Sequence, residues 1–274
     1  MARFLATLGG LIALATLAVS AAPVHPRVVS LMPSLTEDLF AIGAGPEVVA
    51  VSQFTDYPPE AARLPAVSSF ASIDAESIFR LHPDVVVGVT SQAPFVADLR
   101  RLGVRTVLVD DDSYDDIFRN LATLGALSGH AREAAALGSA LRARTAALER
   151  RVKSADRPRV FVVLGVAPIF TVGEGSYIAR LLALAGGRNA AADLREAYGR
   201  YSAEALVASQ PDVIVADKAS GLAAALDRTP WKALRAVREG RVAILDDADV
   251  LERPGPRYNV GLAWLIANIH AGPR

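Results

Sequence analysis

The most restrictive feature of this chain is a segment that occurs twice, 128 positions apart. The sixteen residues DAESIFRLHPDVVVGV from Asp74 align with SAEALVASQPDVIVAD from Ser202, and LFAIGAG from Leu39 aligns more loosely with LLALAGG from Leu181. One match would be weak, because proline ends helices everywhere and short aliphatic strands use few residue types. Two matches in the same order favour a duplication, and two copies predict two related lobes, since solenoids need three or more repeats.

Around the repeat, short β-branched runs alternate with segments of helical period. This alternation predicts an α/β fold with parallel sheets, because buried parallel strands are rich in valine and isoleucine. The predicted strands are 27–31, 48–51, 84–89, 105–110, 160–164, 212–216 and 242–245. The predicted helices are 35–42, 75–81, 95–102, 177–184, 203–208, 230–237 and 260–269.

Between the two copies, residues 129–153 read as one long helix, because leucine and alanine recur at helical spacing. We therefore predict two doubly wound lobes joined by this helix, with a ligand cleft between the lobes. The predicted organisation is a signal peptide over 1–22, an N-terminal lobe over 23–128, a linking helix over 129–154 and a C-terminal lobe over 155–274.

The first residues are typical of an export signal. Arg3 precedes an uncharged stretch from Phe4 to Val19, and small residues follow up to Ala22. A membrane anchor is the alternative, but about sixteen apolar residues are few for a span of roughly 20. The chain has no cysteine, so no lipid-bearing N-terminal cysteine can form. We expect a periplasmic protein, cleaved near Ala22, that is not a lipoprotein.

Composition and motifs argue against several classes of function. The 29 basic residues equal the 29 acidic ones, which disfavours binding of nucleic acid through an excess of positive charge. No nucleophile elbow, phosphate loop or zinc-protease motif occurs. The acidic stretch from Asp110 to Asp116 lacks calcium-loop spacing and is better explained as helix capping. We expect no catalytic residue, no metal site and no cofactor.

Glu76 and Glu204 hold equivalent positions in the repeat, each in the first turn of a predicted helix. A carboxylate there is favourable for local reasons alone, by about 0.3–1 kcal/mol. Two pseudo-symmetric lobes would nevertheless display these carboxylates at matching places. A partner with twofold symmetry could then offer an arginine to each of them.

Aromatic side chains make up only 6% of the chain, and several fall in predicted loops at strand ends. In a doubly wound fold such loops border the ligand crevice. They are Phe54, Tyr57, Phe70, Phe170, Tyr198 and Tyr201. The Pro/Gly-rich stretch from Asp249 to Arg257 adds polar side chains on a rigid backbone.

Seven segments carry a family resemblance: RVVSLMPSLTEDLFAIGAG, VAVSQFTDYPPEA, the VSSF-x5-E step from Val67 to Glu76, LxPDVVV, GVAPIFTVGEGS, SAEALVASQPDVIV and the DxxxRPGPR stretch from Asp249. With them, nearly the whole chain after the signal resembles the periplasmic substrate-binding proteins of ABC importers whose two lobes are joined by one long helix. The likeness is greatest to the corrinoid-binding branch. It implies a monomer that traps cobalamin or a related corrinoid, closes modestly and delivers the ligand to a membrane permease.

The resemblance also assigns roles to individual residues. Phe54 stands at the place of a pocket tyrosine, Phe70 and Tyr198 at those of pocket tryptophans, and Phe170 at that of a pocket phenylalanine. The changed rings keep apolar area but lose indole or phenol hydrogen bonds. The resemblance assigns roles to four further residues. Asp249 and Arg253 match polar residues that face the ligand. Glu76 and Glu204 match lobe-tip residues that dock onto permease arginines.

Two other functions stay open from the residues. The same fold could bind heme or a ferric siderophore, with Tyr57, Tyr198 or Tyr201 as axial ligand to iron. A metal-assisted hydrolase using the cluster from Asp110 to Asp116 is the third hypothesis.

Overall fold

The structure is a computed structural model that describes residues 25–69 and 72–272. The predicted signal segment, residues 1–22, and the predicted ligand residue Phe70 lie outside these residues. Among the helices that the structure describes, none combines the length and the apolar character needed to cross a membrane.

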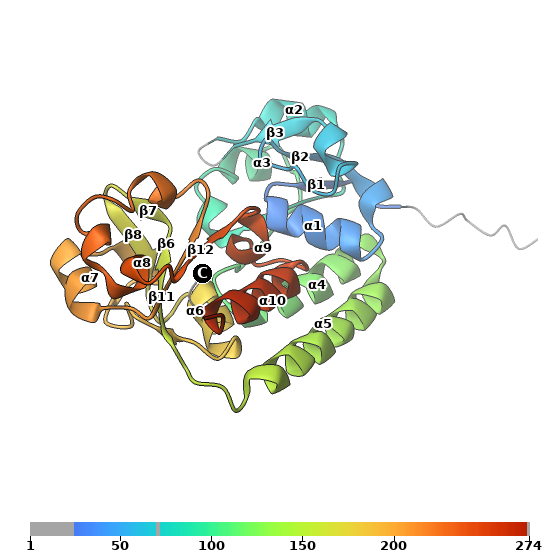
Figure 1. Cartoon of the computed structure of the whole chain (residues 1–274). Helices are drawn as coiled ribbons and strands as arrows, with labels where there is room; N and C mark the ends of the chain where they lie inside the picture. Colours follow the sequence, from blue (N-terminus) through green and yellow to red (C-terminus); the bar gives the residue numbers. More distant parts are fainter. Residues whose placement is uncertain (1–24, 70–71, 273–274) are drawn as a thin grey trace, which may run out of the picture.

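The N-terminal lobe is organised by a parallel sheet with the strand order β3-β2-β1-β4-β5 (Figure 1). Every residue of β1 and β4 is buried, as expected for valine-rich strands covered on both faces. The strands are β1 (Val28–Ser30), β2 (Val48–Ser52), β3 (Ala66–Ser68), β4 (Val85–Val89) and β5 (Thr106–Val109), and the helices are α1 (Pro33–Ala41), α2 (Ala75–Arg80), α3 (Ala97–Arg101) and α4 (Tyr114–Ser128). Because β1 lies between β2 and β4, the order reverses there, which opens a crevice at the carboxyl edge of the sheet.

The C-terminal lobe combines a parallel sheet, β12-β11-β6-β9, with an antiparallel one, β10-β8-β7. The sequence predicted the parallel core but not the antiparallel sheet, whose short strands alternate with turns. The strands are β6 (Arg159–Val163), β7 (Gly165–Val166), β8 (Ile169–Val172), β9 (Arg188–Asn189), β10 (Tyr198–Arg200), β11 (Val213–Asp217) and β12 (Val242–Leu245). The helices are α6 (Tyr177–Leu184), α7 (Ala203–Ser209) and α8 (Arg235–Arg238). The helix predicted over 230–237 is broken, because Leu234 is extended between a 3₁₀ turn and α8.

The helix α5 (Ala131–Val152) lies within the segment predicted to link the lobes and packs against α4 (Figure 1). Gly129, with a φ of +82°, ends α4 in the left-handed region and reverses the chain. The final helix α10 (Tyr258–Ile269) returns to pack on both α5 and α6. One apolar core therefore runs from α1 through α5 and α10 to β6 and α6, so that the two lobes share it.

A buried polar network fixes α10 to α5. Thr145 Oγ1 lies 2.6 Å from the Tyr258 hydroxyl and donates to Asn259 Oδ1 at 3.0 Å, while Asn259 Nδ2 donates to the Leu141 carbonyl at 3.1 Å. The Tyr258 ring also meets Tyr114 of α4 edge-on, with ring centroids 5.3 Å apart. Because buried polar groups are costly to leave unpaired, this network specifies how the last helix is seated.

The repeat found in the sequence is the same helix–turn–strand unit in both lobes. Asp74 and Ser202 cap α2 and α7 through their side chains, with Asp74 accepting from the Ser77 amide and Ser202 from the Ala205 amide. The residues that turn the chain from each helix into the next strand, His82 and Gln210, both have positive φ, at 47° and 38°. Next along the chain, Asp84 and Asp212 each accept a hydrogen bond from the backbone amide of an arginine where the neighbouring strand begins. The arginines are Arg27, just before β1, and Arg159, the first residue of β6. The two copies of the repeated segment therefore have equivalent local structures, as a duplication predicts.

A glycine allows α10 to approach α9 (Asp249–Glu252) closely, and this gives a test of the packing. A Cβ at Gly261 would lie 2.3 Å from the Val250 carbonyl oxygen, so Gly261→Ala must push the two helices apart. We expect the free energy of unfolding to fall by about 1–3 kcal/mol in urea denaturation. Gly175→Ala is the control, because no atom lies within 4 Å of its Cβ, and should change stability by less than about 0.5 kcal/mol. Equal stability of the two variants would contradict the close packing.

Candidate ligand-binding cleft

A cavity of about 380 Å³ lies where the carboxyl edge of the N-terminal sheet meets α9. Its walls come from the segment after β1, the loop after β2, the loop after β5 and the segment around α9, which is the switch-point crevice expected for this topology. The lining residues are Met32, Pro33, Ser34, Phe54, Asp111, Asp249, Glu252, Arg253 and Pro254.

Three of the predicted ligand residues, Phe54, Asp249 and Arg253, line this cavity together. The other two described ones, Phe170 and Tyr198, lie on the antiparallel sheet of the C-terminal lobe and are about one-third exposed. Phe170 pairs with Arg200, and Tyr198 with Val172, so the two aromatic side chains stand on the same face of that sheet. Neither of the two is among the residues that line the cavity.

The centre of the polar contacts is Glu37 on α1, a residue that sequence analysis did not single out. Its side chain is only 1% exposed. Its two carboxylate oxygens accept from Arg257 Nε at 2.7 Å and Arg257 Nη2 at 2.8 Å, and Arg253 Nη1 donates to Oε1 at 3.1 Å. No local motif marks Glu37, because both partners lie more than 200 positions away in the sequence.

Arg253 joins two walls of the cavity. Besides Glu37, its Nη1 donates to Asp56 Oδ1 at 2.8 Å, while its Nη2 donates to the Phe54 carbonyl at 3.3 Å and lies 2.9 Å from Asp249 Oδ2. Both terminal nitrogens are therefore engaged by protein oxygens. Arg253 borders the cleft, but its charge is balanced by the carboxylates around it.

Arg257 supports the outer side of the same wall. Its Nη1 donates to Asp247 Oδ2 at 2.9 Å, and its guanidinium carbon lies 4.1 Å from the centre of the Tyr57 ring. The hydrogen bond to Glu37 raises the pKa of Arg257 above its ordinary value. This contact covers one face of the Tyr57 ring and holds the ring beside Arg257.

Several carboxyl groups of the cleft have pKa values above their ordinary range. Burial, with added repulsion from Asp112 and other neighbouring aspartates, raises the pKa of Asp111 to about 6. Burial and the hydrogen bond shared with Asp217 raise the pKa of Glu252 to about 8, and burial also raises the pKa of Asp249. The cleft is thus lined by carboxyl groups that can accept or donate hydrogen bonds near neutral pH.

Tyr198 faces these carboxyl groups from the C-terminal lobe. Burial, together with the charges of Asp112 and Asp111, raises the pKa of its phenol to about 12. The phenol of Tyr198 is therefore a neutral hydrogen-bond donor toward these carboxyl groups. Tyr201, the third predicted iron ligand, donates instead to Asp193 at 2.8 Å within the C-terminal lobe.

The start of α1 supplies hydrogen-bond donors to the cleft. Ser34 lines the cavity at the second helical position and is 3% exposed, and its hydroxyl has no hydrogen-bond partner. The first amides of a helix have no partner within the helix and carry partial positive charge. The cavity therefore offers donors on its α1 side and carboxyl groups on the others.

The acidic stretch after β5 caps α4 as expected. Ser113 accepts from the Asp116 amide, and the Asp116 carboxylate accepts from the Ser113 amide at 2.8 Å, which makes a capping box. Over residues 25–69 and 72–272, no three His, Cys, Asp or Glu side chains are grouped so as to hold a metal ion.

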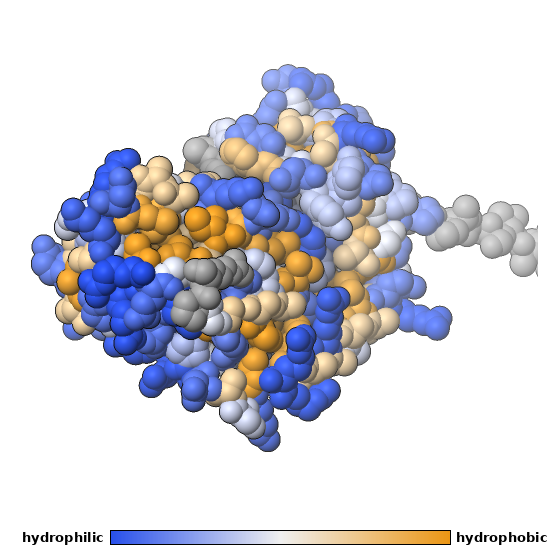
Figure 2. Space-filling view, in the orientation of Figure 1, coloured by the Kyte–Doolittle hydropathy of each residue, from blue (hydrophilic) through white to orange (hydrophobic). Residues whose placement is uncertain are grey.

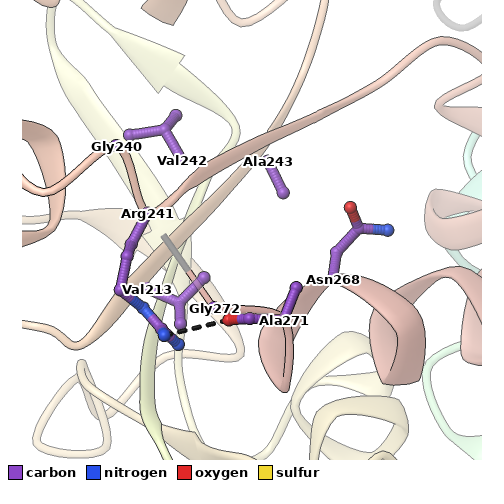
Figure 3. Close-up of a pocket in the computed structure, with 8 residues that line it drawn as sticks. All are labelled: Val213, Gly240, Arg241, Val242, Ala243, Asn268, Ala271 and Gly272. Atoms are coloured by element: carbon purple, nitrogen blue, oxygen red, sulfur yellow. Dashed lines mark hydrogen bonds between the residues drawn. The ribbon is translucent and has the colours of Figure 1, made fainter. Parts of the chain in front are cut away.

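Two other hollows are less suitable for an organic ligand. A pocket beside β12, crossed by the hydrogen bond from Arg241 to the Ala271 carbonyl (Figure 3), has a volume of only about 10 Å³. A larger one of about 590 Å³ lies between α5 and α6 but has no aromatic residue in its lining. Drug-sized ligands occupy pockets of about 300–1,000 Å³ that include apolar and aromatic walls, which favours the cleft at α9.

A family model described as periplasmic binding protein matches residues 28–248, which include the sheets of both lobes. The chain belongs to the periplasmic binding protein family. It is therefore a non-enzymatic substrate-binding protein of an ABC importer, and the hydrolase hypothesis is wrong.

Several proteins with named ligands are similar to this chain in sequence or in structure. The vitamin B12-binding protein of Salmonella choleraesuis is 36% identical over 197 residues, which cover 71% of this chain and 73% of its own length. The solved periplasmic vitamin B12 binding protein of Vibrio cholerae has a TM-score of 0.79 at 30% identity, covering 89% of this chain and 96% of that one. A periplasmic heme binding protein from Pseudomonas aeruginosa has a TM-score of 0.80 at 29% identity, covering 91% and 94%. The two-lobe fold is thus shared by proteins named for different ligands.

The raised pKa of Glu252 predicts a pH effect on stability. The folded protein keeps the proton up to about pH 8, whereas the unfolded chain releases it near the ordinary value of 4.5. Stability contributed by protonated Glu252 is therefore complete below pH 4.5 and is lost as the pH rises to 8. Because part of the side chain is exposed, we expect wild type to lose about 1 kcal/mol relative to Glu252→Gln between pH 5 and 8 in urea denaturation. Glu239→Gln, an exposed control, should keep the wild-type slope, and parallel pH profiles for wild type and Glu252→Gln would contradict the assignment.

Proposed function

We propose that this protein captures cobalamin or a related corrinoid in the cleft beside α9 and delivers it to the permease of an ABC importer. In this proposal it works as a monomer in the periplasm, after removal of residues 1–22 and without a lipid anchor. The sequence relatives named for vitamin B12 support the choice of ligand.

The observation that carries the proposal is the charge of the cleft. Its lining includes Asp111, Asp249 and Glu252, and the one cation among the described lining residues, Arg253, is already bonded to carboxylates. A corrin ring carries neutral carboxamide side chains, whose N–H groups suit carboxyl acceptors and whose carbonyl oxygens suit the donors at the start of α1. The porphyrin edge of heme instead carries two carboxylates, which would be repelled by those wall carboxyl groups that are ionised, such as Asp111 above its pKa of about 6.

The aromatic residues complete the proposed site. Phe54 lines the cavity on the N-terminal lobe, and Phe170 and Tyr198 share an exposed face on the C-terminal lobe. A flat macrocycle could rest against these rings while its polar edge meets the carboxyl groups. We retain Phe70 as a fourth ring of this proposed site from the resemblance alone, because it lies outside the described residues.

Calorimetric titration with cyanocobalamin and hemin tests the ligand. We expect saturable cyanocobalamin binding at micromolar or lower concentration, and Phe54→Ala should weaken it by about tenfold, because an aromatic contact of this kind contributes about 1.4 kcal/mol. Phe79→Ala is the matched control: Phe79 is 44% exposed, close to the 42% of Phe54, but lies on α2 away from the cleft. Absence of saturation by cyanocobalamin at tens of micromolar protein would contradict the corrinoid proposal. A Soret band that appears on addition of hemin and disappears in a tyrosine variant would favour heme as the ligand.

For delivery, we propose that Glu76 and Glu204 dock onto the permease. Both side chains are exposed in the first turns of α2 and α7, which lie at the outer ends of the two lobes, away from α5 (Figure 1). Figure 2 shows hydrophilic residues over both ends. Glu76 is ion-paired with Arg80 at 2.6 Å, an exposed pair that costs little to exchange for a permease arginine.

Charge reversal tests the docking proposal. The double variant Glu76→Lys with Glu204→Lys should abolish co-purification with the permease, because each substitution turns an attraction into a repulsion. Affinity for cyanocobalamin should stay within twofold of wild type. Glu149→Lys with Glu239→Lys reverses two exposed glutamates elsewhere and should leave permease association intact. Loss of ligand binding in the first variant would place these glutamates in the cleft or the fold instead.

A further inference from the structure

We propose that Glu37 is the positioning residue that holds the Phe54 loop and the α9 segment in place as the two walls of the cleft. The proposal rests on the proposed function only for the choice of ligand in one of its tests. It begins from the position of Glu37 on α1, where a carboxylate almost fully removed from water meets two arginines from the end of the chain.

Glu37 carries the charge that orients both arginines. Its neighbour Asp38 is fully buried and has no arginine partner among the described contacts, and burial together with the Glu37 charge raises the pKa of Asp38 well above its ordinary value. A buried carboxylate must be matched by cations and hydrogen bonds, which here come from Arg253 and Arg257. The two guanidinium groups are consequently drawn to one point on the N-terminal lobe.

From that point the arginines reach both walls. Arg253 donates to the Phe54 carbonyl and to Asp56 on the loop after β2, and it also lies within 2.9 Å of Asp249 on α9. Arg257 lies over the Tyr57 ring of the same loop. The aromatic wall and the acidic wall are thus connected through one carboxylate, and moving Glu37 would release both.

Apart from the arginines, α9 is held by packing: Val250 and Leu251 are buried in the shared core, and the Asp249 amide donates to Asp247 Oδ1 at 3.1 Å. The helix α9 has four residues, and its N-cap, Ala248, provides no side-chain cap. So short a helix is unstable without tertiary contacts. In the loop, the Gln53 amide donates to the Ser68 carbonyl at 2.9 Å, the Thr55 amide donates to the Ser52 carbonyl at 3.1 Å, and the hydroxyls of Ser52 and Thr55 are also 3.1 Å apart. The arginine contacts add to this support, and they connect the two walls to each other.

The geometry requires a glutamate. Both oxygens accept from Arg257 in a bidentate pair, and one of them accepts from Arg253 as well. Glutamine has one acceptor oxygen and an NH₂ group that would face a guanidinium donor. Glu37→Gln keeps the size of the side chain and removes this function.

Amide hydrogen exchange in the absence of ligand gives the first test. In Glu37→Gln we expect residues 53–57 and 247–257 to exchange about tenfold faster, with β4 protected as in wild type, because local opening is separated from global unfolding. The matched control is Glu47→Gln, a glutamate of the same lobe whose side chain is also 1% exposed but which pairs with His25 at 2.7 Å. Glu47→Gln should leave exchange in both segments unchanged.

Ligand affinity gives the second test. Glu37→Gln should raise the Kd for cyanocobalamin about tenfold, although Glu37 does not line the cavity, and Glu47→Gln should not change it. Unchanged exchange in both segments of Glu37→Gln, or equal effects of the two variants, would overturn the positioning role. If wild type binds no cyanocobalamin, the corrinoid proposal fails, while the exchange experiment still decides the role of Glu37.

A milder variant covers the case in which Glu37→Gln does not fold. Asp56 is 65% exposed and accepts only one arm of Arg253, so Asp56→Asn should fold normally. We expect faster exchange of residues 53–57, by about threefold, with residues 247–257 less affected. No change at residues 53–57 would contradict the claim that Arg253 holds this loop.

Discussion

A carboxylate that is withdrawn from water has to be compensated, and here the compensation of Glu37 brings the two ends of the chain together. The arginines that pair with it belong to the segment between α9 and α10, and they cannot reach Glu37 unless that segment crosses to the N-terminal lobe. The crossing places α9 over the carboxyl edge of the N-terminal sheet and closes the cleft on one side. It also brings α10 to its place on α5 and α6, where the Thr145 and Tyr258 hydroxyls meet.

The chemistry of the cleft follows from the same arrangement. Because Arg253 is committed to Glu37, Asp56 and Asp249, the cavity keeps an excess of carboxyl groups, and partial burial holds protons on them. In the proposed function, a ligand that lies there presents neutral hydrogen-bonding groups to these walls. This would favour a carboxamide edge over a carboxylate edge, although proteins named for vitamin B12 and for heme share the fold.

Much of the fold could be predicted from the sequence because local residue patterns determine most of its helices and strands. The repeat from Asp74 and Ser202 marked a unit whose capping residues and strand-entry aspartates are equivalent in the two lobes. Short antiparallel strands such as β7 and β10 escaped prediction, since two or three residues carry no detectable period. Phe54, Asp249 and Arg253 were found and do meet in one cavity, but Glu37 was missed. Its burial and its partners depend on contacts over 200 residues away, which one sequence read along its length does not reveal.

The shared core has a consequence for how the chain becomes a folded protein. Residues of α10 fill the space between α5, α6 and Tyr114 of α4, and they follow the strands of both lobes in the sequence. The first lobe therefore cannot finish its own core when its own residues are complete. The shared core of the two lobes is complete only when α10 has packed into it. We therefore expect both lobes to unfold in one transition on heating rather than in two separate transitions. The two lobes contain copies of one sequence unit, yet we expect them to fold as a single cooperative unit.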